Sequence, residues 1–329
     1  MGLLASRLGF PTVVSGAPFP IIVGSERSGT TIFCLMLNAH PELAMAFESY
    51  FVPEMWALRD RWSRPEGFDL DAWVNDLLTD PAAETFRQRW GMDSHDLRRQ
   101  VTGVEPITYG DAVRRLYRLY AEGRGKRRYG DKNAGYVVGL PILASLFPEA
   151  RFLHLVRDGR DAALAHAHAR FGPQDYAVAA RTWARTVTRI RRFGRQLGPG
   201  RYLELRYEAL VHEPGSVLEE VCEFIGLGFN AKMLAPEEAE TAAFGLTTHG
   251  SHASAWLPLT PGLRDWRRDL CEHDLAMFEA VAGPSLREFG YDRAFPAVPL
   301  TARFRALRPL ALDRAQRARA RLARGMGLT

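Results

Sequence analysis

The 329-residue sequence is 47% hydrophobic and 25% charged, which are ordinary values for a folded soluble protein. No apolar run approaches the ~20 residues that a membrane-spanning helix needs, and the N-terminus lacks the pattern of a secretory signal peptide. The formal net charge of +5 is uneven, because residues 301–329 hold eight Arg and one Asp, which leaves −2 for residues 1–300.

The cysteines argue against a disulfide-stabilised fold. Cys34, Cys222 and Cys271 are too few for a disulfide framework. Cys34 and Cys222 lie among apolar residues and are expected in the core. A reducing, cytoplasmic setting fits this cysteine usage best.

The N-terminal part of the sequence predicts a strand, a loop and a helix in succession. Residues 19–23 form a short apolar run that is typical of a buried strand. After a glycine-containing loop, residues 30–37 have helical character and stop at Asn38-Ala39-His40-Pro41. A second short strand is expected at residues 43–47.

Residues 55–128 differ in character from what precedes them. They are rich in helix-forming residues and contain Trp56, Trp62, Trp73 and Trp90. We expect a mostly helical insertion that covers one end of the sheet. Contact with a ring-bearing acceptor and simple packing explain the tryptophans equally well.

The second half alternates strands with amphipathic helices. Strands are expected at residues 151–156 and 201–206, and helices from about residue 158, over 176–190 and over 214–225. This alternation predicts an α/β fold with a P-loop-type central parallel sheet flanked by helices.

The chain is expected to consist of one enzyme domain over residues 1–300 and a basic, Arg-rich tail over residues 301–329. The tail is expected to be a solvated helix or a frayed end. The alternative is that the tail contacts an acidic partner, a membrane surface or nucleic acid.

A phosphate-binding loop is indicated by Gly24-Ser25-Glu26-Arg27-Ser28-Gly29-Thr30-Thr31. Two glycines separated by four residues let successive N–H groups point inward, and the positive end of the following helix completes an anion cradle. A nucleoside-triphosphate P-loop has a lysine where Thr30 stands here. The cation is Arg27, near the loop apex. A cradle without evident magnesium ligands favours transfer of a sulfuryl group, which carries less charge than a phosphoryl group.

A second anion site is indicated by Arg157-Asp158-Gly159-Arg160-Asp161, which follows the strand at residues 151–156. Ligands of open parallel sheets bind at the carboxyl edge of the strands. Arg157 is therefore placed to meet a second phosphate, on the ribose of a nucleotide. The alternative is structural, with Asp158 capping the helix and Arg157 paired with Asp161.

With these motifs in this order, the sequence resembles the PAPS-dependent sulfotransferases, which use 3′-phosphoadenosine-5′-phosphosulfate (PAPS), and in particular their bacterial-like branch with an Arg-Ser-Gly-Thr-Thr loop. The resemblance covers most of residues 20–290. Residues 24–31 resemble the family's 5′-phosphosulfate loop and residues 155–161 its 3′-phosphate motif. Residues 131–136, 206–210 and 266–268 resemble its Asp-Lys-Thr-Pro-Gly-Tyr segment, its Arg-Tyr-Glu-Asp-Leu turn and its C-terminal Trp-Arg segment.

The resemblance implies PAPS as co-substrate, no required metal, and a set of donor-binding residues. These are Ser25, Arg27, Ser28, Gly29, Thr30, Thr31, Arg157, Tyr207, Trp266, Arg267 and Arg268. Tyr207 would lie near the adenine, and residues 266–268 would close over the donor. Ala165 is a departure, because the family usually has a serine there that contacts the 3′-phosphate.

In-line attack of an acceptor oxygen on sulfur requires positioning, charge stabilisation and one proton acceptor. Glu48 is the predicted base, since Ala46-Phe47-Glu48-Ser49-Tyr50 resembles the family's Pro-Pro-Glu-Thr/Ser-His segment and apolar surroundings strengthen a carboxylate as a base. Arg27 and Lys132 are predicted to stabilise the sulfuryl oxygens and the leaving phosphate.

Each catalytic assignment has an alternative. Glu48 could be a charge at a helix N-terminus, Lys132 a surface ion pair with Asp131, and His40 the base. His249 and His252 have no further ligands nearby and predict no metal site.

The function expected is sulfuryl transfer from PAPS to a hydroxyl, less readily an amine, of a small-molecule or carrier-bound acceptor, with no nucleic-acid partner. The main alternative is a P-loop nucleotide kinase or another phosphoryl transferase. A non-catalytic nucleotide-binding or interaction module is the third hypothesis.

Overall fold

The computed structural model describes residues 16–325 except 66, 85, 87–89, 92–96, 99–100, 102–107, 134–136, 170–172 and 237–264. The described residues form two compact units. Those within residues 1–24, 29–155 and 190–259 make up the first, here called the sheet unit, and those within residues 25–28, 156–189 and 260–329 make up the second, the helical unit.

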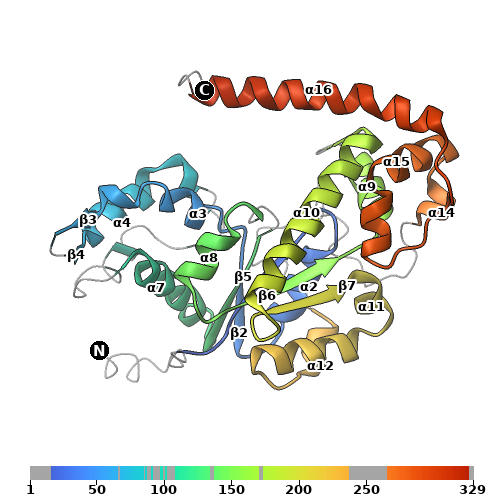
Figure 1. The fold of residues 1–329 in the computed structure, drawn as a ribbon. Coiled ribbons are helices and arrows are strands. Elements are labelled where there is room, and N and C mark those ends of the chain that lie inside the picture. The colour runs from blue at the N-terminus through green and yellow to red at the C-terminus, as the bar shows by residue number, and fades with distance from the viewer. Residues whose placement is uncertain are drawn as a thin grey trace. The chain divides into compact units, whose positions relative to one another are not determined.

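The centre of the sheet unit is a five-stranded sheet in the order β2-β5-β1-β6-β7 (Figure 1). The strands are β1 (Phe19–Gly24), β2 (Leu43–Phe47), β5 (Arg128–Lys132), β6 (Ala150–Val156) and β7 (Tyr202–Arg206). β1 pairs in parallel with both β5 and β6, and β2 pairs in parallel with β5. The prediction of a P-loop-type central parallel sheet flanked by helices is confirmed.

Both faces of the sheet are buried, as expected for a parallel sheet. In β1, Ile22 packs into one core while Ile21 and Val23 pack into the other. The first core is covered by α2 (Thr30–Asn38), α11 (Tyr207–His212) and α12 (Pro214–Ile225), together with the short η4 (Ala231–Leu234). The helices predicted at residues 30–37 and 214–225 are confirmed.

The second face is covered by the insertion and by α8 (Leu140–Leu146). The insertion contains α3 (Phe51–Trp56), η1 (Arg59–Arg61), the ribbon β3–β4 (Ser63–Arg64 and Gly67–Phe68), α4 (Leu70–Thr79), η2 (Pro81–Ala83) and α7 (Tyr109–Glu122). Where it is described it is mostly helical, as predicted, but it packs on a face of the sheet rather than at one end. Trp62, Trp73 and Trp90 belong to this core.

One strand of the central sheet was not anticipated. β5 reads Arg-Tyr-Gly-Asp-Lys, and all its residues are buried although three of them are charged. Its position between β1 and β2 leaves no room for a side chain at Gly130, where a Cβ atom would lie 2.4 Å from the sulfur of Met45. A polar strand of this kind gives no apolar pattern to detect in a sequence.

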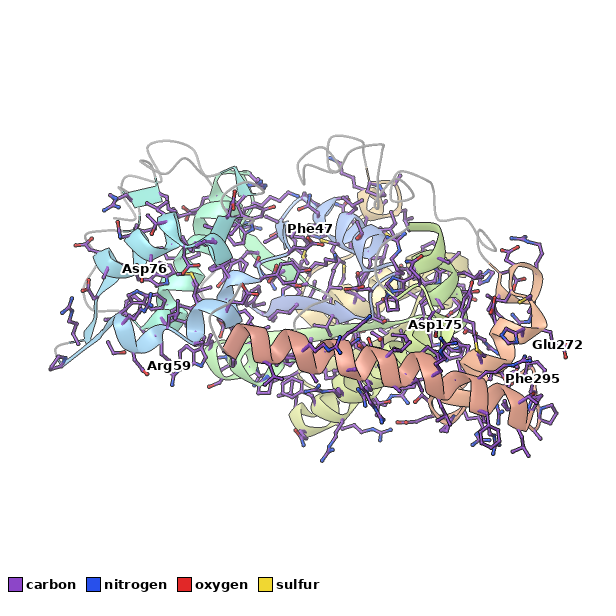
Figure 2. All side chains as sticks on the ribbon, turned by 90° about the horizontal axis from the view of Figure 1, so that it is seen from above. Phe47, Arg59, Asp76, Asp175, Glu272 and Phe295 are labelled. Atoms are coloured by element: carbon purple, nitrogen blue, oxygen red, sulfur yellow. The ribbon has the colours of Figure 1, made fainter. Side chains whose placement is uncertain are left out.

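The helical unit contains α9 (Gly159–Ala169), the first part of α10 (Tyr176–Leu197), α14 (Trp266–Asp269), α15 (Glu272–Glu288) and α16 (Leu300–Gly325). Its core includes Trp183, Phe278 and Phe289. Phe295 packs beside Ala276 and Ala302, and Figure 2 shows its position near the start of α16. Across the described residues, no helix combines the length and the apolar character needed to span a membrane.

Candidate active site

In the sheet unit, four neighbouring strands end at one edge. The pairing places Phe47 opposite Lys132 and Gly24 opposite Leu155. The chain leaves β1 towards β2 on one side, whereas β6 is followed by β7 on the other. The ends of β1 and β6 therefore mark a topological switch point, which is where open α/β sheets bind their ligands.

Glu48 and Lys132 meet at this edge. Lys132 Nζ lies 3.6 Å from Glu48 Oε1 and 4.2 Å from the centroid of the Phe47 ring. Glu48 has a φ of 55°, in the left-handed region, and its N–H donates to the Lys132 carbonyl over 2.8 Å. Lys132 is only 3% exposed, so it does not lie at the surface, as the alternative of a surface ion pair required.

Asp131 fixes the backbone and side chains around this pair. It is fully buried, and its Oδ1 accepts hydrogen bonds from Ser49 Oγ (3.0 Å) and the Lys132 N–H (2.9 Å). Its Oδ2 accepts from the Tyr117 hydroxyl over 2.9 Å. The carboxylate thus joins the residue after Glu48 to Lys132 and to α7. The sequence did not indicate this role, because Tyr117 has the helical spacing of an ordinary core residue.

The N-terminus of α2 is shaped by Gly29 and Tyr207. Gly29 precedes the helix with a φ of 89°, and a Cβ atom there would lie 2.4 Å from the Tyr207 ring. A glycine is required on both counts. The first helical N–H groups, at Thr30 and Thr31, have the arrangement that binds anions. The structure therefore brings Tyr207 to the predicted phosphate loop.

In the helical unit, the other loop residues form a tight turn. The backbone N–H and the Oγ of Ser28 both donate to the Ser25 carbonyl, over 3.2 and 2.5 Å. Arg27 adopts a left-handed φ of 62°. Arg157, which is 7% exposed, donates from Nη1 to the Arg27 carbonyl over 3.3 Å. The two predicted anion-binding arginines are thus in contact.

The segment that follows Arg157 is held rigidly. Trp183 Nε1 donates to the Arg157 carbonyl over 3.0 Å, and a Cβ at Gly159 would lie 2.4 Å from the Trp183 ring. Arg160 is buried and makes a bidentate pair with Asp158 and a 2.8 Å bond to Glu279. Asp158 Oδ1 also accepts a hydrogen bond from the Arg160 backbone N–H over 2.9 Å, so Asp158 caps α9, as the structural alternative expected, and binds the Arg160 side chain as well.

The C-terminal Trp-Arg segment is joined to the Arg157 motif. The Trp266 N–H donates to Asp161 Oδ1 over 2.9 Å, and the Arg160 guanidinium lies 3.6 Å from the Trp266 ring centroid. The side chains of Arg267 and Arg268 are largely exposed. Neither the Arg160–Trp266 contact nor Glu279 was anticipated, because their partners are far apart in the sequence.

His40 has a structural role. Its Nδ1 accepts from the Glu42 N–H over 3.1 Å, and its Nε2 lies 2.9 Å from the Gly228 carbonyl, to which it donates. Burial lowers the pKa of His40, despite the opposing effect of that carbonyl. A neutral ring with both nitrogens engaged is a poor candidate for the base.

Some predicted features cannot be placed. Residues 134–136 and both His249 and His252 lie outside the described residues. Ala165 is a buried residue of α9. Within the described part of the chain, no group of three or more His, Cys, Asp or Glu side chains is arranged to hold a metal ion.

Comparison with known proteins identifies the class of enzyme to which this chain belongs. The family described as "Sulfotransferase family" matches residues 18–231, so the chain belongs to the sulfotransferase family. The prediction of an enzyme that transfers a sulfuryl group to an acceptor is confirmed, and nothing supports the kinase alternative.

Among its relatives is protein-tyrosine sulfotransferase 1 of Homo sapiens, which is 28% identical over 289 residues, or 84% of this chain and 70% of the relative. Protein-tyrosine sulfotransferase A of Caenorhabditis elegans is 25% identical over 285 residues, or 84% of this chain and 68% of the relative. The sulfotransferase domain from the Synechococcus PCC 7002 olefin synthase has a similar fold, with a TM-score of 0.60 and 24% identity over 86% of this chain and 97% of that one.

Proposed function

We propose that this sulfotransferase moves the sulfuryl group of PAPS to an acceptor hydroxyl, with Glu48 as the general base. The observation that carries the proposal is the pair of Glu48 and the buried Lys132 at the carboxyl edge of the sheet, 3.6 Å apart. A carboxylate and an ammonium at one strand edge supply a proton acceptor and a stabilising charge at the same place.

The donor-binding assignments of the sequence become part of this proposal. Ser25, Arg27, Ser28, Gly29, Thr30 and Thr31 would bind the 5′-phosphosulfate, and Arg157 would bind the 3′-phosphate. Left-handed residues at positions 27 and 29 turn the backbone so that N–H groups can converge on an anion. Arg27, Arg157 and Lys132 add positive charge of the kind that a donor rich in phosphate needs.

The remaining donor contacts are assigned to Tyr207 and to residues 266–268. Tyr207 would pack against the adenine, from its position beside Gly29. Arg267 and Arg268 have exposed side chains that could reach the 3′-phosphate in place of the serine that Ala165 lacks. The cation–π contact between Arg160 and Trp266 would fix the position of residues 266–268 before the donor binds.

The chemistry is an in-line displacement. The acceptor oxygen forms a bond to sulfur, the bond from sulfur to the 5′-phosphate oxygen breaks, and the hydroxyl proton passes to Glu48. Lys132 and Arg27 would stabilise the sulfuryl oxygens and the negative charge that develops on the leaving phosphate. Asp131 would keep Glu48 and Lys132 at a fixed separation during this step.

For the acceptor, we expect a hydroxyl on a small molecule or carrier-bound intermediate. The names of the protein-tyrosine sulfotransferase relatives make a phenolic hydroxyl the first to test. Trp62, Trp73 and Trp90 are core residues, so they do not form the acceptor site. A cytoplasmic setting agrees with three free cysteines, of which Cys271 is exposed.

Thermal unfolding tests donor binding. Without magnesium, adenosine 3′,5′-bisphosphate should raise the melting temperature, whereas ADP and ATP should have much less effect. A ligand at 100 times its Kd stabilises the folded state by about 2.7 kcal/mol. An equal response to ATP would contradict the assignment of PAPS as donor. Turnover that persists in EDTA would support the absence of a required metal.

Glu48→Gln tests the base. We expect kcat to fall by about 10²–10⁴-fold, while adenosine 3′,5′-bisphosphate still stabilises the protein. Glu42→Gln is the matched control, because Glu42 forms an exposed ion pair with Arg127 in the same unit. If the two variants kept equal activity, Glu48 would not be the base.

A further inference from the structure

Helix α16 has one face fixed on the helical unit. Ala302 and Ala306 are buried, and Ala302 packs against Ala276 and Val298. Arg181, itself only 7% exposed, donates to the Leu310 carbonyl over 3.2 Å and pairs with Asp313. The orientation of the helix about its axis is therefore determined.

The opposite face of α16 is apolar and exposed. Leu300, Phe304, Leu307 and Leu322 are 66%, 69%, 59% and 64% exposed. At about 100° per residue, these four side chains lie within a sector of about 60°. Exposed Ala311 and Ala318 continue the same stripe. Leu312 is also exposed but lies outside this sector.

Arginines border the stripe on both sides. Arg303 and Arg314 lie along one border and Arg308 and Arg319 along the other, and all four are exposed. The segment carries eight Arg and one Asp. That aspartate is already engaged, since Asp313 pairs with Arg181 and with Arg317. The face thus combines apolar side chains with uncompensated positive charge.

We propose that this face of α16 docks on an anionic phospholipid bilayer. Leu300, Phe304, Leu307 and Leu322 would enter the boundary between headgroups and acyl chains, and the arginines would contact the lipid phosphates. An apolar stripe between rows of arginine is typical of helices that lie in a membrane interface. A second copy of the chain fits less well because it would bring arginine rows together, and a nucleic acid would not need the apolar stripe.

The full-length chain should co-sediment with vesicles of equal parts phosphatidylcholine and phosphatidylglycerol, and much less with phosphatidylcholine alone. Phe304→Ser combined with Leu307→Ser should weaken this binding at least about tenfold, because two apolar side chains leave the interface. Leu312→Ser is the matched control, since it removes an equally exposed leucine of the same helix.

The arms of the experiment separate the competing occupants. Arg303→Gln with Arg308→Gln should remove the preference for anionic vesicles without changing the melting temperature. Equal binding by the Phe304/Leu307 and Leu312 variants would overturn the proposal. So would concentration-dependent dimerisation that the Phe304/Leu307 variant abolishes, or tight binding of duplex DNA that it leaves intact. Stabilisation by adenosine 3′,5′-bisphosphate should be the same in every variant, which distinguishes failure here from failure of the proposed enzymatic function.

Discussion

At the scale of single residues, Asp131 and Lys132 at the edge of the sheet are buried charged residues, and each needs partners that compensate its charge. Lys132 is 3% exposed, and a buried ammonium is unfavourable unless other groups compensate it. Glu48 supplies a carboxylate and Phe47 the face of an aromatic ring. Asp131 in turn accepts hydrogen bonds from three donors, the Ser49 and Tyr117 hydroxyls and the Lys132 backbone N–H. The Glu48–Lys132 pair is therefore arranged by contacts within the protein.

Asp131→Asn tests this positioning role. An amide presents N–H groups on one side and cannot accept all the hydrogen bonds that the carboxylate accepts, so Ser49 and Lys132 should lose their fixed geometry. We expect kcat to fall about tenfold or more with little change in KM for PAPS, and stability to fall by about 1.5–3 kcal/mol.

The control for this variant is Asp76→Asn. Asp76 accepts a 2.8 Å hydrogen bond from Trp62 Nε1, within the insertion. This change should lower the melting temperature but leave kcat unchanged. If both variants lost activity only in proportion to stability, Asp131 would be structural and not a positioning residue.

At the scale of elements, β5 is the strand that places Asp131 and Lys132 at the carboxyl edge of the sheet. It pairs with β1 and β2 and ends at Lys132. β5 has a strand on each side, so side chains of the neighbouring strands lie close to its backbone. Gly130 leaves room for them because it has no side chain. A Cβ at this position would lie 2.4 Å from Met45 Sδ and 2.9 Å from Pro20 Cγ.

Gly130→Ala should therefore destabilise the protein by about 1–3 kcal/mol, because the inserted methyl group overpacks the core. Gly215→Ala provides the contrast: Gly215 lies in α12, and a Cβ there meets no atom within 4 Å. That substitution should be neutral or raise stability by up to about 1 kcal/mol. Urea unfolding of both variants measures the difference, and equal stabilities would show that Met45 and Pro20 move aside without cost.

At the scale of the whole molecule, a buried polar network makes stability depend on pH. His154 is fully buried on β6, and its Nδ1 lies 2.7 Å from the hydroxyl of Tyr202, which donates to Glu204 over 2.8 Å. Burial lowers the pKa of His154 despite the nearby Glu204 carboxylate. Burial alone would raise the pKa of Glu204, but the hydrogen bonds from His154 and Arg191 outweigh it and lower that pKa.

Both shifts predict loss of stability in acid. The unfolded chain binds a proton at His154 near pH 6.5, whereas the folded chain resists it, so stability falls as the pH drops below about 6.5. Glu204 contributes stability above its ordinary value of 4.5 and loses it as the pH falls further. Each group changes the free energy of unfolding by at most about 1.4 kcal/mol per pH unit.

Replacing His154 with Asn should flatten the dependence of the melting temperature between pH 7 and pH 5, because one titrating group is removed while a hydrogen-bond donor is retained. The exposed His212, replaced in the same way, is the control for loss of a histidine. An unchanged slope in the His154 variant would assign the acid sensitivity elsewhere.

Elements with a local residue pattern could be predicted from the sequence. The apolar run of β1, the loop of residues 24–31 and the amphipathic α12 are each read from neighbouring residues, and the order of the motifs was sufficient to indicate a sulfotransferase. The position of β5, the burial of Lys132 and the connection of Ser49 to Tyr117 through Asp131 are seen only in the folded structure. The physical reason is that a polar strand or a buried carboxylate is stable only through partners distant in the chain, and no local periodicity records those partners.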